Sequence, residues 1–234
     1  MITLYDYELS GNCYKIRLLL SMLGVAYQKK TIEFYPAAAH RHDDFLSINP
    51  LGQLPVLQDD LLILRESHAI LVYLASQYDK SGTWLPNSTP ATLAQVTQWM
   101  CFADALTASA SAARLADGFF HELDGDACRS EAHKLFRILD EHLWYNEREQ
   151  LDWLVSGKHP TIADLACFTY SILCEEGGIS RIDYPAIRRW TDRVKRLPGF
   201  IVMPGVFPAG PAIPSSDAEP VQPANSMQEE SHSS

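Results

Sequence analysis

The N-terminal residues alternate between apolar and polar side chains and then change to helical spacing. The alternation over residues 2–7 predicts a strand. Over residues 13–23 the spacing predicts a helix that Gly24 ends, with its apolar positions at Ile16, Leu19, Leu20 and Leu23. Residues 27–34 predict a second strand. We therefore expect a β-α-β unit with a right-handed crossover.

Two short apolar runs and a helix follow this unit. Residues 55–58 and 61–64 flank an Asp-Asp pair and predict a hairpin. Ser67 begins the next predicted helix, whose apolar face carries Ile70, Leu71 and Leu74. The first part of the chain thus predicts a small sheet covered by helices.

The pattern changes in the second half of the chain. Residues 91–196 have long helical patterns and no convincing strand, which predicts a helical bundle. From residue 204 onward Pro, Ser, Ala and Glu dominate and large apolar residues nearly vanish. Such a segment buries too little apolar surface to order itself, so we expect residues 204–234 to form a disordered tail.

Composition and charge narrow the function classes. The chain has 234 residues, a net charge of −10 and no basic run, which argues against partners such as nucleic acid or an anionic membrane. Its five cysteines form no C-x-x-C pair, as suits free thiols in a reducing compartment. No basic leader or bilayer-length apolar run is present. We expect a soluble cytoplasmic protein.

The stretch ELSGNCYKIR joins the first strand to the first helix. It offers a hydroxyl, an amide and a thiol at Ser10, Asn12 and Cys13. Ser and Asn are also preferred helix N-caps, so the stretch alone suits a cap as well as a reactive site.

Four motifs in order carry a family resemblance: NPLGQLPVL, RESHAILVYLA, HPTIADLACF and YPAIRRWTDRVKRLPGF. Together they resemble the cytosolic glutathione transferase family, over roughly residues 1–203. The resemblance implies an α/β thioredoxin-like domain that binds glutathione, residues 1–82, and an all-α helical C-terminal domain, residues 88–203. It also implies a homodimer that uses glutathione as co-substrate and needs no metal.

The resemblance assigns the opening stretch to thiol activation. A free thiol has a pKa of about 8.5, and a helix N-terminus with a hydrogen-bond donor lowers it. Ser10 matches the hydroxyl of serine-type members, and Asn12 would add an amide donor. In C-x-x-C redox proteins the first cysteine is the exposed nucleophile. Ser10 stands at that position here, which argues against a mechanism with an enzyme–glutathione mixed disulfide. We expect Cys13 to be a small buried residue.

The resemblance assigns glutathione contacts to two further motifs. It makes Leu54–Pro55 a cis peptide, with Leu54 pairing with the cysteinyl backbone and Gln53 helping to hold it. An ordinary trans proline before an edge strand is the alternative. Glu66 and Ser67 would hold the ammonium and carboxylate of the γ-glutamyl group, since a helix N-terminus attracts a carboxylate. Helix capping is the alternative for this pair.

The loop AAAHRHDDF offers a partner for the glycine carboxylate. By resemblance His40 matches best and Arg41 second. A metal site made of His40, His42 and Asp43 or Asp44 is a weak alternative, and a solvated loop is the commonest explanation of such a run.

Two further segments of the predicted helical half have distinctive sequences. Thr161 and Asp164 resemble a capping box, with a structural role. Residues 92–115 predict a helix, and the segment MCFADALTASASAARLADGFF within and after it is rich in small residues. It would face a cleft lined by Phe102, Phe119 or Phe120, or else pack closely against another helix, as at a dimer interface.

The leading functional hypothesis is a glutathione transferase that joins the glutathione thiolate to an electrophilic small molecule. A pathway-specific enzyme that performs glutathione addition to an intermediate, ether cleavage or isomerisation would use the same residues, as would a detoxification enzyme. A non-catalytic binding module with the same fold is a third hypothesis.

Overall fold

A computed structural model describes residues 1–86, 89–118 and 123–206. Its N-terminal part contains a four-stranded sheet in the order β2-β1-β3-β4. β1 (Ile2–Asp6) pairs in parallel with β2 (Gln28–Thr31), whereas β3 (Val56–Asp59) pairs antiparallel with both β1 and β4 (Leu62–Arg65). The predicted β-α-β unit and hairpin are confirmed.

The second strand is shorter than its predicted range of 27–34. All of β2 is exposed at the edge of the sheet, and the last bond to β1 is donated by Ile32 N to Asp6 O at 2.8 Å. The chain then leaves the sheet because Pro36 has no N–H and Ala38 has a left-handed φ of 50°. The short helices η1 (Ala39–Arg41) and α2 (Asp43–Leu46) follow.

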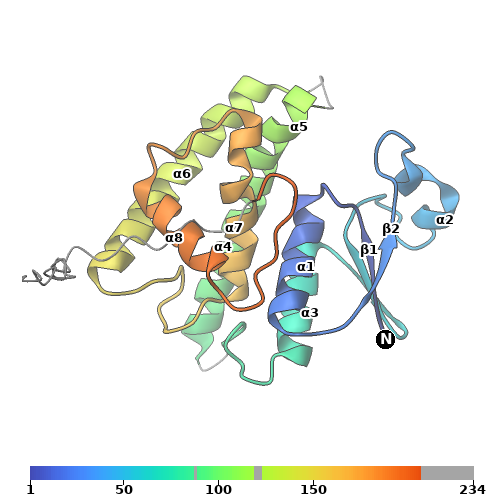
Figure 1. Ribbon diagram of the computed structural model, residues 1–234, viewed down its shortest axis with the longest axis horizontal. Coiled ribbons are helices and arrows are strands. Elements are labelled where there is room, and N and C mark those ends of the chain that lie inside the picture. The colour runs from blue at the N-terminus through green and yellow to red at the C-terminus, as the bar shows by residue number, and fades with distance from the viewer. Residues whose placement is uncertain (87–88, 119–122, 207–234) are drawn as a thin grey trace, which may run out of the picture.

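Two helices separate the sheet from the C-terminal half of the molecule. α1 (Gly11–Met22) and α3 (Ser67–Tyr78) lie between the sheet and the C-terminal helices (Figure 1). Leu18, Leu19 and Leu20 of α1 are all fully buried, because this helix is covered on several sides. Gly24 ends the α1 segment with a φ of 65°, as predicted.

The described residues after 88 contain helices and no strand up to residue 196, which confirms the helical second half. α4 (Pro90–Leu106) continues into a π-helical turn, η2 (Thr107–Ser111), and then α5 (Ala112–Gly118). The remaining helices are α6 (Gly125–Arg148), α7 (Ile162–Ile172), η3 (Cys174–Gly177) and α8 (Pro185–Lys195). No helix among the described residues is long and apolar enough to cross a membrane.

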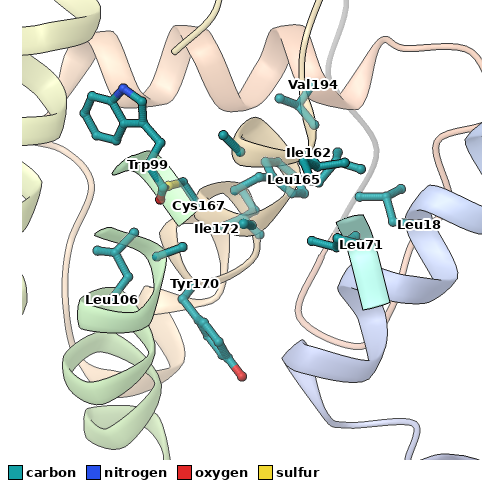
Figure 2. Close-up of a cluster of buried hydrophobic side chains, with 14 of the residues drawn as sticks. Leu18, Leu71, Trp99, Leu106, Ile162, Leu165, Cys167, Tyr170, Ile172 and Val194 are labelled. Carbon is teal, nitrogen blue, oxygen red and sulfur yellow. The ribbon is translucent and has the colours of Figure 1, made fainter. Parts of the chain in front are cut away.

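One hydrophobic core joins the two parts. Leu18 of α1 and Leu71 of α3 face Leu165 and Ile172 of α7, and Figure 2 shows these side chains together with Trp99 and Leu106 of α4. Because α7 contacts both the α/β part and the helices behind it, its residues are buried along its whole length.

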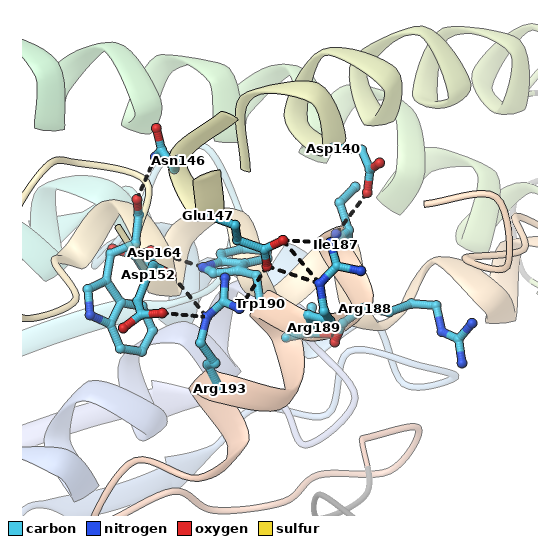
Figure 3. A network of polar contacts seen from close by, with 12 residues as sticks. Asp140, Asn146, Glu147, Asp152, Asp164, Ile187, Arg188, Arg189, Trp190 and Arg193 are labelled. Atoms are coloured by element: carbon cyan, nitrogen blue, oxygen red, sulfur yellow. Dashed lines mark hydrogen bonds and ion pairs between the residues drawn. The ribbon is translucent and has the colours of Figure 1, made fainter. Parts of the chain in front are cut away.

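α7 begins with the predicted capping box. Asp164 is fully buried and accepts hydrogen bonds from Thr161 N at 2.8 Å and Leu154 N at 3.1 Å. It also accepts from Trp190 Nε1 at 3.0 Å (Figure 3). Burial raises the pKa of this carboxyl, and the hydrogen bonds oppose that effect. The structural role expected for the Thr161 motif is confirmed.

A second polar network fastens α8 to α6. Glu147 accepts from Arg189 Nη2 at 2.5 Å and from Arg193 Nη1 at 2.8 Å (Figure 3). After α8 the chain stays packed as far as Val206, which is 1% exposed and bridges to Met203. The start of the expected tail at residue 204 is therefore too early, and residues 207–234 lie outside the described residues.

Candidate functional site

A cavity of about 700 Å³ lies where the two parts of the protein meet. It is bordered by the loop after β1, the N-termini of α1 and α3, and the continuous α4–η2–α5 segment. Most of the site residues expected from the sequence line it: Ser10, Asn12, Arg41, Gln53, Leu54, Pro55, Glu66 and Ser67.

A side chain of α1 fixes the loop that carries Ser10. The buried Arg17 pairs with the Asp6 carboxylate, and its Nη2 donates to Glu8 O at 2.9 Å. Ser10 N donates to Tyr7 O at 3.0 Å. Since both ends of the turn are fixed, the Ser10 side chain has a defined place at the cavity wall.

Ser10 is both a helix cap and a cavity residue. Its Oγ accepts a hydrogen bond from Cys13 N at 3.2 Å, which caps α1. This bond uses a lone pair of the oxygen, so the hydroxyl proton stays available to a ligand. The two interpretations of this residue are therefore compatible.

Asn12 and Cys13 differ in their surroundings. Asn12 lines the cavity, and its buried Oδ1 has no hydrogen-bond partner among the described residues. Cys13 is fully buried, and burial raises the pKa of its thiol to about 12. As predicted, Cys13 is a buried side chain, and its thiol is unsuited to act as a nucleophile.

The turn before β3 brings backbone groups to the cavity. Leu54–Pro55 is a cis peptide, as the resemblance implied. The buried Asn49 orders the turn, because its Nδ2 donates to Gln53 O at 2.8 Å and its Oδ1 accepts from Leu51 N at 3.1 Å. Sequence reasoning missed this supporting residue, which lies in the quoted NPLGQLPVL motif.

The pair at the start of α3 faces the cavity without capping the helix. Glu66 occupies the N-cap position with a φ of 67°, yet its side chain makes no capping hydrogen bond. Ser67 is the first helical residue and is 8% exposed. The capping alternative therefore lacks its side-chain hydrogen bond, and both residues line the cavity.

The two candidates in the loop before α2, His40 and Arg41, differ in their surroundings. His40 is 6% exposed and stacks on Phe34 with a ring-centroid distance of 3.9 Å, so it does not line the cavity. Burial and the neighbouring Arg41 lower its pKa. Arg41 lines the cavity instead. Among the described residues, no group of three or more His, Cys, Asp or Glu side chains is placed to hold a metal.

The helical side of the cavity differs from expectation. Phe102 packs edge-on against Trp99, with 5.0 Å between the ring centroids, and does not line the cavity. Phe119 and Phe120 lie outside the described residues. The α4–η2–α5 segment instead contributes Asp104, Thr107, Ser111, Ala112, Arg114 and Leu115. The predicted cleft is therefore present with a more polar lining.

A buried cation lies behind this wall. Lys15 is fully buried, with Nζ at 5.0 Å from the Tyr170 ring centroid and 3.3 Å from His68 Nε2. Burial lowers the pKa of Lys15 to about 8. Burial and then the Lys15 charge lower the pKa of His68 to about 4, while its Nδ1 lies 3.1 Å from Asp104 Oδ1. The only sequence signal was a lysine inside an apolar helix.

Comparison with known proteins shows which family this chain resembles. A family model described as "Glutathione S-transferase, N-terminal domain" matches residues 1–76. Glutathione S-transferase GstB of Escherichia coli K12 is 31% identical, over 85% of this chain and 95% of its own. The Transcriptional regulator URE2 of Saccharomyces cerevisiae is 27% identical, over 85% of this chain and 66% of its own.

Solved structures extend the likeness to the whole fold. A glutathione S-transferase from Xanthobacter autotrophicus Py2 superposes with a TM-score of 0.76 at 31% identity, covering 88% of this chain and 98% of its own. Ure2p in complex with glutathione gives a TM-score of 0.75 at 26% identity, covering 85% and 91%. This chain belongs to the glutathione S-transferase family.

Proposed function

We propose that this protein is a glutathione transferase that joins the thiolate of glutathione to an electrophilic carbon of a small molecule. The observation that carries the proposal is the shared cavity, which collects Ser10, Gln53, Leu54, Glu66 and Ser67 from separate segments of the chain. A structural relative described in complex with glutathione supports the same ligand.

Glutathione would lie along the α/β wall of the cavity. The backbone of Leu54 would pair with its cysteinyl residue, as an added strand pairs with a sheet edge. Ser67 and the N-terminus of α3 would bind the γ-glutamyl carboxylate, and Glu66 would bind the neighbouring ammonium. Arg41 would bind the glycine carboxylate, since it faces the cavity where His40 does not.

Ser10 would activate the thiol. Its oxygen accepts from Cys13 N, so its proton can be donated to the sulfur, where it stabilises the thiolate. The N-terminus of α1 favours the same negative charge, and Asn12 would add an amide donor. Holding both reactants in one cavity would supply much of the remaining acceleration.

The proposal includes a glutathione-binding part at residues 1–82, a helical part at residues 88–203 and assembly into a cytoplasmic homodimer.

The likeness to URE2, called a transcriptional regulator, raises a second candidate function. In that role the protein would bind glutathione without activating its thiol.

Titration of bound glutathione by ultraviolet thiolate absorbance separates the two candidates. We expect the bound thiol of the wild type to ionise at least about one pKa unit below the free value of about 8.5. Ser10→Gly should abolish that difference at a small cost in capping, because glycine is a tolerated N-cap. Ser76→Ala, at an exposed position on α3, is the matched control.

Each result has a distinct meaning. Bound glutathione with an unchanged thiol pKa would contradict catalysis and favour the binding role. A wild-type protein that binds no glutathione would overturn both candidates.

A further inference from the structure

The cavity wall opposite the α/β part is polar where an electrophile would lie. Asp104, Thr107, Ser111 and Arg114 recur at roughly helical spacing along the α4–η2–α5 segment and all line the cavity. Thr107 Oγ1 donates to Ala103 O at 2.9 Å, within its own helix. The Asp104 carboxylate is next to His68. Arg114 reaches from this wall to the Ser10 loop.

Arg114 is fixed by two partners on different elements. Its Nε pairs with Glu176 of η3, and its Nη1 donates to Leu9 O at 3.0 Å. Leu9 directly precedes Ser10 in the chain. The side chain of Arg114 is 14% exposed. A guanidinium held in this way lies at the reacting end of the cavity, beside the proposed thiolate.

One nitrogen of this guanidinium is left for a ligand. No residue in the described part of the chain accepts a hydrogen bond from Arg114 Nη2. Because the guanidinium is planar, fixing Nε and Nη1 also fixes the direction of Nη2. η3 packs tightly on α5 as well, since a Cβ at Gly177 would lie 2.7 Å from Arg114 N. Arg114 is thus a rigid, preorganised donor.

The charges nearby select the kind of oxygen that this donor suits. Glu176 pairs with Arg114, and Glu66 and Asp104 also line the cavity. A permanently anionic group on the electrophile would meet these carboxylates and the thiolate. A neutral carbonyl oxygen gains negative charge only as the reaction proceeds, which is where a preorganised donor stabilises most.

We propose, resting on the proposed function, that Arg114 binds the carbonyl oxygen of the electrophile and makes neutral α,β-unsaturated carbonyl compounds the preferred substrate class. The thiolate forms a bond to the β-carbon, the carbon–carbon double bond opens, and the electron pair moves to the oxygen as an enolate. Arg114 stabilises that enolate, and the α-carbon then takes a proton from water. No leaving group or oxidant is involved.

Three four-carbon probes test this assignment: crotonaldehyde, n-butyl bromide and crotonate. For Arg114→Gln we expect kcat/KM with crotonaldehyde to fall roughly a hundredfold, the usual cost of losing one oxyanion donor. The value with n-butyl bromide, which has no oxygen, should change less than about threefold on the same argument. Glutathione affinity should stay at its wild-type value, and the lost positive charge should raise the bound thiol pKa slightly, an effect that both substrates share.

Two further variants separate binding from support of the loop. Arg181→Gln removes an arginine that pairs with Glu175 of the same η3 helix and does not line the cavity, so both rates should hold. Glu176→Gln leaves Arg114 in place without its carboxylate. Crotonate should then inhibit the variant more strongly than the wild type, while crotonaldehyde remains a substrate.

Several results would overturn the inference. Equal losses with both substrates in Arg114→Gln, together with a shifted thiol pKa, would make Arg114 a support for the Ser10 loop only. A wild type that conjugates n-butyl bromide and ignores crotonaldehyde would refute the substrate class and leave the transferase function standing. Failure to bind glutathione would refute that function itself.

Discussion

The ring of Tyr170 lies so close to Gly11 that a Cβ at residue 11 would come within 2.7 Å of Tyr170 Cε1. Gly11 begins α1, directly after Ser10, and Tyr170 belongs to α7. The absence of a side chain thus lets the helical part of the protein support the helix that carries the proposed thiol-activating group.

Gly11→Ala should therefore displace either α1 or Tyr170. We expect a loss of about 1–3 kcal/mol in the free energy of unfolding, as for other overpacked cores, together with weaker glutathione binding. Urea unfolding and glutathione titration measure the two effects. Gly157→Ala is the control, because a Cβ there meets no atom within 4 Å. The smaller side chain of Tyr170→Leu should partly rescue Gly11→Ala, and additive effects of the two changes would contradict the clash.

The buried carboxylate of Asp164 should matter for stability alone. Asp164→Ala would leave the N–H groups of Leu154, Thr161 and Trp190 without their acceptor. Each unpaired buried donor costs about 1–3 kcal/mol, so we expect a total loss of about 3 kcal/mol or more. Urea unfolding measures the loss, and Asp126→Ala on the surface of α6 should change stability by less than about 1 kcal/mol. The KM for glutathione is measured under conditions in which the Asp164→Ala variant is folded. A large change in this KM would contradict a purely structural role.

The elements that sequence reasoning identified well have strong local patterns. The alternation that starts at residue 2 predicts a strand, and the spacing of the leucines of α1 predicts a helix. Both predictions are confirmed. Ser10, Glu66 and Ser67 were named through the family resemblance, because their places at junctions between elements also suit helix caps. Their roles stay a prediction that the resemblance implies.

The side-chain directions were harder to predict. The predicted helix at residues 92–115 contains the π-helical turn Thr107–Ser111, which rotates the following residues relative to an α-helix. Polar residues on a helix also usually indicate a solvent-exposed face, so Asp104 and Arg114 drew no attention. In the loop before α2, where Ala38 has a left-handed φ of 50°, His40 is buried and Arg41 lines the cavity. No residue type signals that choice.

Arg41 and His40 should respond differently to substitution. Arg41→Gln should raise the KM for glutathione about tenfold with little change in kcat, because it would remove a charged hydrogen bond to the glycine carboxylate. His40→Gln should mainly lower stability, since it would remove the ring stacked on Phe34. Steady-state kinetics and urea unfolding separate the two effects. His42→Gln, next in the chain, should leave KM unchanged. A larger KM effect from His40 than from Arg41 would restore the original assignment.

The Lys15–His68 contact should make stability depend on pH in acid. The pKa of His68 falls from 6.5 to about 4 on folding, so between these values the unfolded chain binds the extra proton and the folded protein does not. Stability is therefore lost as the pH falls from 6.5 toward 4, by up to about 3 kcal/mol from this group. Protonation is opposed by burial and by Lys15, and favoured by Asp104.

His68→Gln should remove that part of the pH dependence. Urea unfolding at pH values across this window should give a flatter stability profile for His68→Gln than for the wild type, because glutamine does not titrate. His159→Gln replaces an exposed histidine and should keep the wild-type slope. If the two variants have the same profile, the acid sensitivity arises elsewhere. If the difference instead has the opposite sign, His68 is charged in the folded protein, and its proton would be shared with Asp104 in spite of Lys15.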